Sequence, residues 1–133
     1  MIEKFYAVTQ TSLYEVLAKG SDGSPEVTKI ALKGESVIKV GGKLRNGTML
    51  AICPWLQMYV PEKYGVLHQL TGVERQIEKI NTGYWGGHTS HIIALFTTEV
   101  DARKCFESSD LKPCDPRWAA MTIAVLKQIG DDH

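Results

Sequence analysis

The chain has 133 residues, of which 44% are hydrophobic and 23% are charged, as in an ordinary globular protein. Its 15 Lys and Arg residues balance its 15 Asp and Glu residues, which argues against a generic nucleic-acid or anionic-membrane binder. A chain of this length fits one domain, and we expect residues 1–133 to form a single domain.

The N-terminus and the cysteines predict a cytoplasmic protein. The first five residues include Glu3 and lead into no apolar run, unlike a secretory signal peptide. No stretch approaches the roughly 18 apolar residues that a membrane span requires. Cys53, Cys105 and Cys114 are an odd number of cysteines at unrelated spacings, so we expect reduced thiols and no disulfide framework.

The first half of the chain has the patterns of strands. The side chains of residues 4–10 alternate between two faces, and residues 12–17 contain residues that favour strands. Residues 26–32 follow a segment at 20–25 that is rich in turn-forming residues. Asn46-Gly47 is a strong hairpin signal, because a type I′ turn requires positive φ at both central residues.

The middle of the chain predicts two further strands and one short helix. Residues 48–53 and 55–60 are apolar on both faces, and Pro54 separates them because it cannot donate to a strand ladder. Residues 71–74 fit a capping box and open a helical spacing of apolar residues up to Ile80. The β-branched residues of that segment would also suit a strand.

The C-terminal part predicts one strand and two helices. Residues 91–96 form the strand, and a threonine cap followed by acids opens a helix whose buried stripe is Ala102, Cys105 and Phe106. Asp115 caps the last helix, Pro116 takes its first position and Gly130 ends it. We expect its buried face to consist of Trp118, Met121, Val125 and Ile129.

These elements predict one α+β domain. Its β-rich N-terminal half would contain about five or six short, mostly antiparallel strands, packed with two or three C-terminal helices.

Residues 83–91 form the most distinctive stretch, with three of the 12 glycines, two of the four histidines and one of the three tryptophans. Paired glycines allow a ligand to approach the backbone closely, and loop aromatics and histidines are common in binding sites. We expect a concave, partly accessible pocket for a small molecule or a protein partner. Its ligand-binding residues would be Tyr84, Trp85, His88, Thr89 and Ser90.

Two alternatives remain for this loop. It is a structural loop if Trp85 fills the core and the glycines only allow close packing. It is a catalytic loop if His88 or His91 acts as the general base of a small hydrolase or transferase. A nucleophilic Ser90 would need an orienting third group, which the sequence does not reveal.

The sequence contains no signature of a metal or cofactor site. His88, His91, Cys105 and Cys114 are suitable zinc ligands, but their spacings match no zinc-finger pattern. Cys53 lacks the second cysteine of a redox motif and should be buried and inert. We therefore expect no metal and no cofactor.

A local surplus of positive charge lies in residues 29–45. Lys29, Lys33, Lys39, Lys43 and Arg45 are interrupted by one acid, Glu35. This hairpin could bind an anionic partner such as nucleic acid, with Lys43 or Arg45 at the rim of the pocket. The simpler interpretation is a solvated edge whose lysines discourage strand pairing between molecules. Self-association into a homodimer is a further alternative for the partner.

Overall fold

The computed structural model describes residues 3–17, 26–36, 38–44, 53, 90–112 and 115–131. They form strands β1 (Lys4–Val8), β2 (Ser12–Leu17), β3 (Glu26–Leu32) and β4 (Ala94–Phe96), and helices α4 (Glu99–Phe106) and α5 (Pro116–Asp131). This arrangement confirms the α+β class. The strands expected at 48–53 and 55–60, the helix expected at 71–80 and the Asn46-Gly47 turn lie outside the described residues, apart from Cys53.

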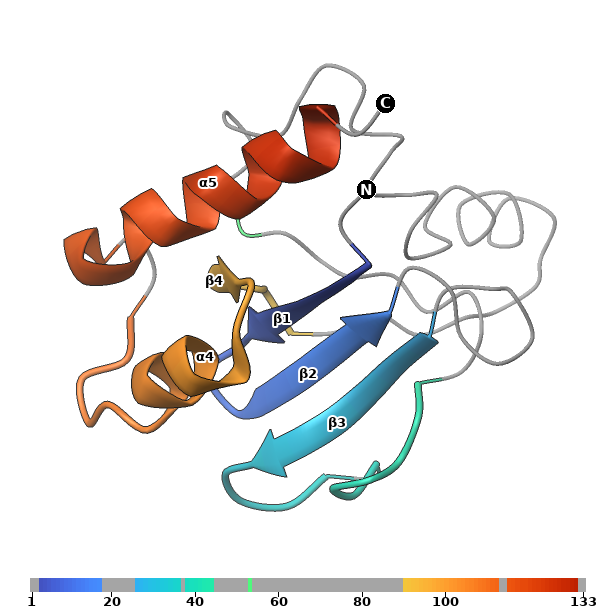
Figure 1. Ribbon diagram of the computed structural model, residues 1–133. Helices are drawn as coiled ribbons and strands as arrows, with labels where there is room; N and C mark the ends of the chain where they lie inside the picture. Colours follow the sequence, from blue (N-terminus) through green and yellow to red (C-terminus); the bar gives the residue numbers. More distant parts are fainter. Residues whose placement is uncertain are drawn as a thin grey trace, which may run out of the picture.

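The four strands form one antiparallel sheet in the order β3-β2-β1-β4. The first three are neighbours in the chain, whereas β4 pairs with β1 across a long separation in sequence, with Ala7 opposite Leu95. Helix α4 packs against β1, β2 and β4, and α5 runs along β4 (Figure 1). The long-range pairing of β4 therefore places both C-terminal helices on the N-terminal sheet.

β1 is the buried centre of the sheet. Phe5, Tyr6, Ala7 and Val8 are consecutive and all buried, so both faces of the strand are covered. α4 contributes the predicted stripe of Ala102, Cys105 and Phe106 to the same core, which confirms that expectation.

The turn between β1 and β2 shortens the first predicted strand, which ends at Val8 and not at residue 10. The Thr9 amide donates to the Ser12 carbonyl over 2.8 Å, and the Thr9 hydroxyl oxygen accepts from the Ser12 amide over 2.9 Å. The same hydroxyl lies 3.2 Å from the Ser12 carbonyl oxygen, to which it donates. A threonine that bonds its own turn in this way competes with the strand ladder.

The strand predicted at 91–96 is also shorter than expected. β4 begins at Ala94, and Ile92 precedes it in an isolated bridge. The Ile93 amide still donates to the Val8 carbonyl over 2.8 Å, and the Ile92 carbonyl accepts from the Cys53 amide over 3.1 Å. The segment is extended, but its pairing is irregular before Ala94.

Both helices begin at the predicted caps. The Thr98 hydroxyl accepts from the Asp101 amide over 3.3 Å, and the Asp115 carboxylate accepts from the Arg117 amide over 3.0 Å. Pro116 is the first residue of α5, as predicted, and the helix continues one residue past Gly130 to Asp131. Neither of the two described helices has the length and the apolar character needed to cross a bilayer.

The buried face of α5 differs from the predicted one. Met121 is 40% exposed, whereas Thr122 and Leu126 are fully buried beside Val125. Trp118 is half-buried and meets Phe96 of β4 edge to face, with ring centroids 5.9 Å apart. The buried stripe therefore follows positions 118, 122, 125 and 126, a helical spacing in which a threonine replaces the expected methionine.

Candidate functional site

Ser90 and His91 are the described members of the glycine- and histidine-rich stretch, and both are exposed. Tyr84, Trp85, His88 and Thr89 lie outside the described residues, so the pocket expected there stays a prediction. Directly after His91 the chain becomes buried, and Ile92 has no exposed surface. The described end of the stretch thus presents two polar side chains at the point where the chain enters the core.

The backbone that follows these two residues is held from two directions. The Ile92 carbonyl accepts a hydrogen bond from Cys53, and the Ile93 amide donates one to Val8 of β1. On the next residues, the Leu95 amide donates to the Thr122 hydroxyl of α5 over 3.1 Å. A loop that is anchored on such a scaffold can present side chains in a defined direction.

The described lysines of residues 29–45 differ in exposure and in the groups that they contact. Lys29 is only 3% exposed, so it belongs neither to the solvated edge that the sequence favoured for residues 29–45 nor to the positive face that was its alternative. Lys33 places its ammonium nitrogen 4.5 Å from the centroid of the Phe106 ring. Lys43 donates to the carboxylate of Glu26 over 2.6 Å, whereas Lys39 is exposed. Arg45 lies outside the described residues.

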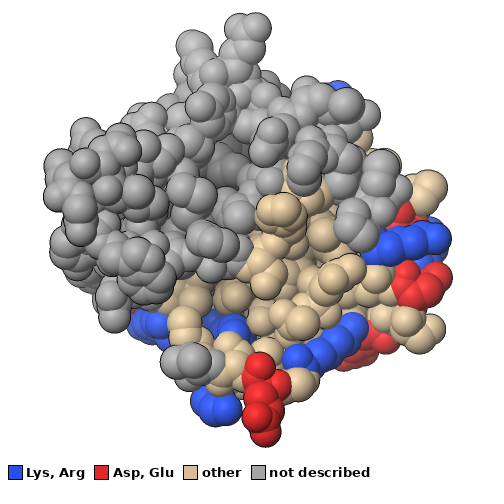
Figure 2. All heavy atoms as spheres, turned by 180° about the vertical axis from the view of Figure 1, so that it is seen from behind, with Lys and Arg blue, Asp and Glu red and all other residues tan. Residues whose placement is uncertain are grey.

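The surface charge of the described residues is mixed in sign. On the face shown in Figure 2, Lys and Arg side chains lie interspersed with Asp and Glu side chains beside an area of uncharged residues. A nucleic-acid interface usually presents a stripe or patch of one positive sign. The visible charge pattern gives no support to a broad nucleic-acid surface.

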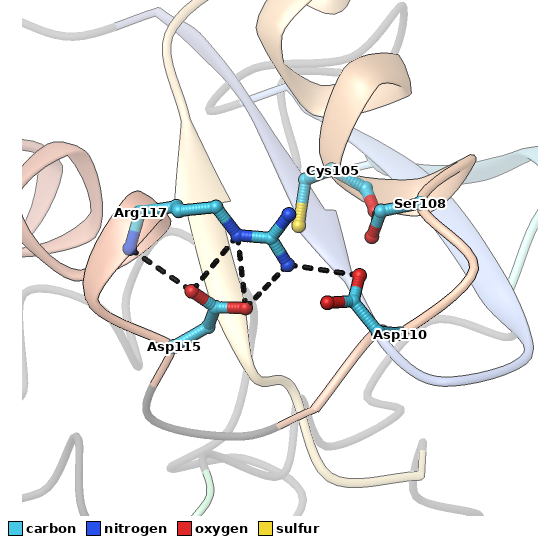
Figure 3. A network of polar contacts seen from close by, with 5 residues as sticks. All are labelled: Cys105, Ser108, Asp110, Asp115 and Arg117. Carbon is cyan, nitrogen blue, oxygen red and sulfur yellow. Dashed lines mark hydrogen bonds and ion pairs between the residues drawn. The ribbon is translucent and has the colours of Figure 1, made fainter.

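The densest polar network of the described residues joins the loop after α4 to the beginning of α5 (Figure 3). The Arg117 guanidinium donates to both carboxylate oxygens of Asp115, with its shortest contact at 2.6 Å from Nη2 to Oδ2. The same Nη2 donates to Asp110 over 2.9 Å. Arg117 therefore connects the helix cap with the loop that precedes it.

Charge and burial perturb the titration of this network. The side chain of Asp115 is 4% exposed, and the hydrogen bonds from the Arg117 side chain and backbone lower the pKa of its carboxyl to about 2. The Arg117 side chain also lowers the pKa of Asp110, and the two carboxylates raise the pKa of Arg117. The three groups remain charged over the physiological range, which suits a structural ion pair more than a proton-transfer site.

Cys105 lies beside this network but is not poised for reaction. Burial, and then the negative charge of Asp115, raise the pKa of its thiol to about 12. Since the thiolate is the nucleophile and metal ligand, Cys105 behaves as the small buried hydrophobe that the sequence predicted. Among the described residues, no group of three or more His, Cys, Asp or Glu side chains is placed to hold a metal ion.

Sequence reasoning found the cap at Asp115 but missed Arg117 and Thr122. Arg117 follows two residues after the capping aspartate, a spacing that could have indicated the ion pair. Thr122 had no comparable signal, because its partner, Leu95, is distant in the chain.

Comparison with known proteins brings no relative that could identify the site. No family model, curated protein or solved structure matches this chain. A proposal about function therefore rests on the chemistry and geometry of the residues themselves.

Proposed function

We propose that this chain is a small cytoplasmic binding module that holds a small molecule or a protein partner at residues 83–91. The observation that supports this proposal is the contrast between Ser90 and His91, which are exposed, and Ile92, which is fully buried. Polar side chains on a loop that leads directly into an anchored core segment are a common construction for binding. The ligand-binding residues of the proposal are Tyr84, Trp85, His88, Thr89 and Ser90.

The proposal includes the finer features of the expected architecture. We infer a single domain over residues 1–133 with five or six short strands and two or three helices, of which the described sheet and helices are a part. The buried thiol of Cys105, with its raised pKa, is compatible with a reducing cytoplasm.

A ligand screen by thermal unfolding tests the binding function. Wild-type protein is heated with defined nucleotides, sugar phosphates, amino acids and dicarboxylates, because a ligand that binds only the native state raises the melting temperature. His88→Ala and Ser90→Ala should weaken the binding of each stabilising compound and leave the melting temperature of the free protein almost unchanged, since surface substitutions usually cost less than about 0.5 kcal/mol. Ser109→Ala, another exposed serine, is the matched control and should bind normally.

Three outcomes would contradict the proposal in different ways. If the two loop variants unfold, the stretch is structural. If a compound is converted into product and His91→Ala abolishes turnover without weakening binding, the chain is a small hydrolase or transferase. If no compound raises the melting temperature, sedimentation velocity at several protein concentrations tests whether the chain forms a homodimer. If the chain is a monomer and the loop binds no partner, the proposed binding function of this loop is wrong.

A further inference from the structure

Lys29 carries a positive charge that the described structure buries without a negative partner. The residue lies on β3 and is 3% exposed. Its ammonium nitrogen donates to the Ser36 hydroxyl over 3.0 Å and lies 5.7 Å from the centroid of the Tyr14 ring. A hydroxyl and an aromatic ring stabilise an ammonium, but neither carries a formal charge. Among the described residues, no carboxylate pairs with Lys29, although buried charges in proteins are normally paired.

The segment after β3 brings a turn that contains a second lysine, Lys39, next to Lys29. The chain turns beyond Leu32 and runs back along the outer side of β3 (Figure 1). The Gly42 amide donates to the Lys39 carbonyl over 2.9 Å and closes a four-residue turn, in which Gly41 has a φ of 88°. A positive φ at the third position is the requirement of a type II turn and favours glycine.

Two backbone hydrogen bonds fix this turn to Lys29. The Gly41 amide donates to the Lys29 carbonyl over 2.7 Å, and the Lys29 amide donates to the Gly42 carbonyl over 3.0 Å. Burial lowers the pKa of Lys29, and the positive charge of Lys39 lowers it further. The backbone therefore holds the turn that contains Lys39 against Lys29, and the positive charge of Lys39 disfavours the charged form of Lys29.

The remaining described lysines of this segment are engaged elsewhere. Lys33 stacks on Phe106, and Lys43 is paired with Glu26. Lys39 is exposed, and Ser36, whose hydroxyl accepts from Lys29, is half-buried, so two of the three residues have surface open to solvent.

We propose that Lys29, Lys39 and the Ser36 hydroxyl form a binding site for one phosphate group, carried by a small molecule or free in solution. A phosphate group has a charge of about −1.5 to −2 at neutral pH, which matches two ammonium groups, whereas a carboxylate would leave one of them uncompensated. Two ammonium donors and one hydroxyl donor also match three peripheral phosphate oxygens. This site is separate from residues 83–91 and does not depend on the binding proposed there.

Titration with inorganic phosphate, followed by amide NMR, tests the site directly. The pH is fixed and sodium chloride keeps the ionic strength constant, so that general screening does not change. The amide signals of Ser36, Gly41 and Gly42 should shift and saturate. Lys39→Met should weaken binding at least about tenfold, equivalent to about 1.4 kcal/mol. Since Lys39 is exposed, this variant should keep the wild-type spectrum outside the turn.

Two further variants separate the site from its surroundings. Lys29→Met should weaken phosphate binding as strongly as Lys39→Met, and it removes a buried charge without shortening the aliphatic chain appreciably. Lys43→Met is the matched control, because Lys43 already has Glu26 as its partner, and it should bind phosphate as the wild type does. Titrating glycerol 3-phosphate beside inorganic phosphate shows which source is preferred, and tighter binding of either one supports the site.

Two results would overturn the proposal. One is the absence of a saturable shift up to about 50 mM phosphate, where a millimolar site would be filled. The other is binding of a single-stranded oligonucleotide, with a steep loss of affinity in salt, that Lys43→Met and Lys39→Met weaken equally. That pattern would indicate a general basic surface and no phosphate site at Lys29.

Discussion

Thr122 provides the sharpest test of how α5 is joined to the sheet. Its hydroxyl is fully buried, donates to the Trp118 carbonyl over 2.9 Å and accepts from the Leu95 amide over 3.1 Å. The Leu95 amide belongs to β4, which is the outer strand of the described sheet. One side-chain oxygen of the helix therefore supplies the acceptor for a main-chain amide of the sheet.

Thr122→Val keeps the shape of the side chain and removes this acceptor. The Leu95 amide would then be buried without a partner, which costs about 1 to 3 kcal/mol. The methyl group that replaces the hydroxyl offsets up to about 0.8 kcal/mol through burial of apolar surface. The Trp118 carbonyl keeps its main-chain partner in the helix. We expect a net destabilisation of about 1 to 2 kcal/mol, or a decrease of about 3 to 10 °C in melting temperature.

Thr122→Ser is the matched variant, because it keeps the hydroxyl and removes the methyl group. Its cost is that of a deleted buried methyl, about 0.5 to 1.5 kcal/mol, so stability alone does not separate the two variants. Native-state hydrogen exchange does separate them. The Leu95 amide should exchange faster than its neighbours in Thr122→Val and should remain protected in Thr122→Ser. If Thr122→Val is as stable as wild type and Leu95 keeps its protection, the proposed role of the hydroxyl is wrong.

Four further predictions follow from the same contacts. The pKa of the Asp115 carboxyl is lowered to about 2, so this group contributes stability that is present above its unfolded pKa of about 3.9 and is lost as the pH falls through about 2. Arg117→Met should raise the pKa of Asp115 in a carbon NMR titration, and an unchanged pKa would refute the ion pair. Cys105 should resist thiol reagents at about pH 8 in the native protein and react after denaturation, as peptide mapping can show; rapid native labelling would contradict its raised pKa of about 12. Trp118→Phe should change the free energy of unfolding by less than about 1 kcal/mol, because the indole nitrogen is buried without a hydrogen-bond partner. Trp118→Ala should lower the free energy of unfolding by about 2 to 3 kcal/mol in chemical denaturation, and equal effects of the two variants would contradict this reasoning. Gly41→Ala should destabilise the protein by about 1 kcal/mol or more because of the positive φ, and an unchanged melting temperature would argue against the turn.

Local sequence patterns predicted the elements whose signals lie within a few residues. The strands Ser12–Leu17 and Glu26–Leu32 have the expected bounds, and both helices begin at their expected caps. Caps and turns are readable because donor and acceptor are neighbours in the chain. The ends of strands were less predictable, as Thr9 shows, since a short side chain that bonds its own turn can end a strand early.

The candidate sites depended more on the tertiary structure. The sequence predicted a partly accessible pocket in the stretch 83–91; only Ser90 and His91 of this stretch are described, both exposed, and the pocket stays a prediction. For residues 29–45 it favoured a solvated edge and left a positive face as the alternative, but the structure buries Lys29 and pairs Lys43 with Glu26. The direction of a side chain relative to its sheet depends on register, and the partner of a charge depends on which segments meet.

By itself, the sequence determined the α+β class, the helix caps and the buried stripe of α4, because periodicity and capping are local properties of the chain. Only the tertiary structure decided that β4 pairs with β1, that Thr122 and not Met121 faces the core, and that Lys29 is buried beside the turn that contains Lys39. Each of these depends on a pairing between distant segments, whose geometry is selected by packing of the whole core. A charge that looks like part of a solvated edge in the sequence can therefore become a buried group that needs a partner.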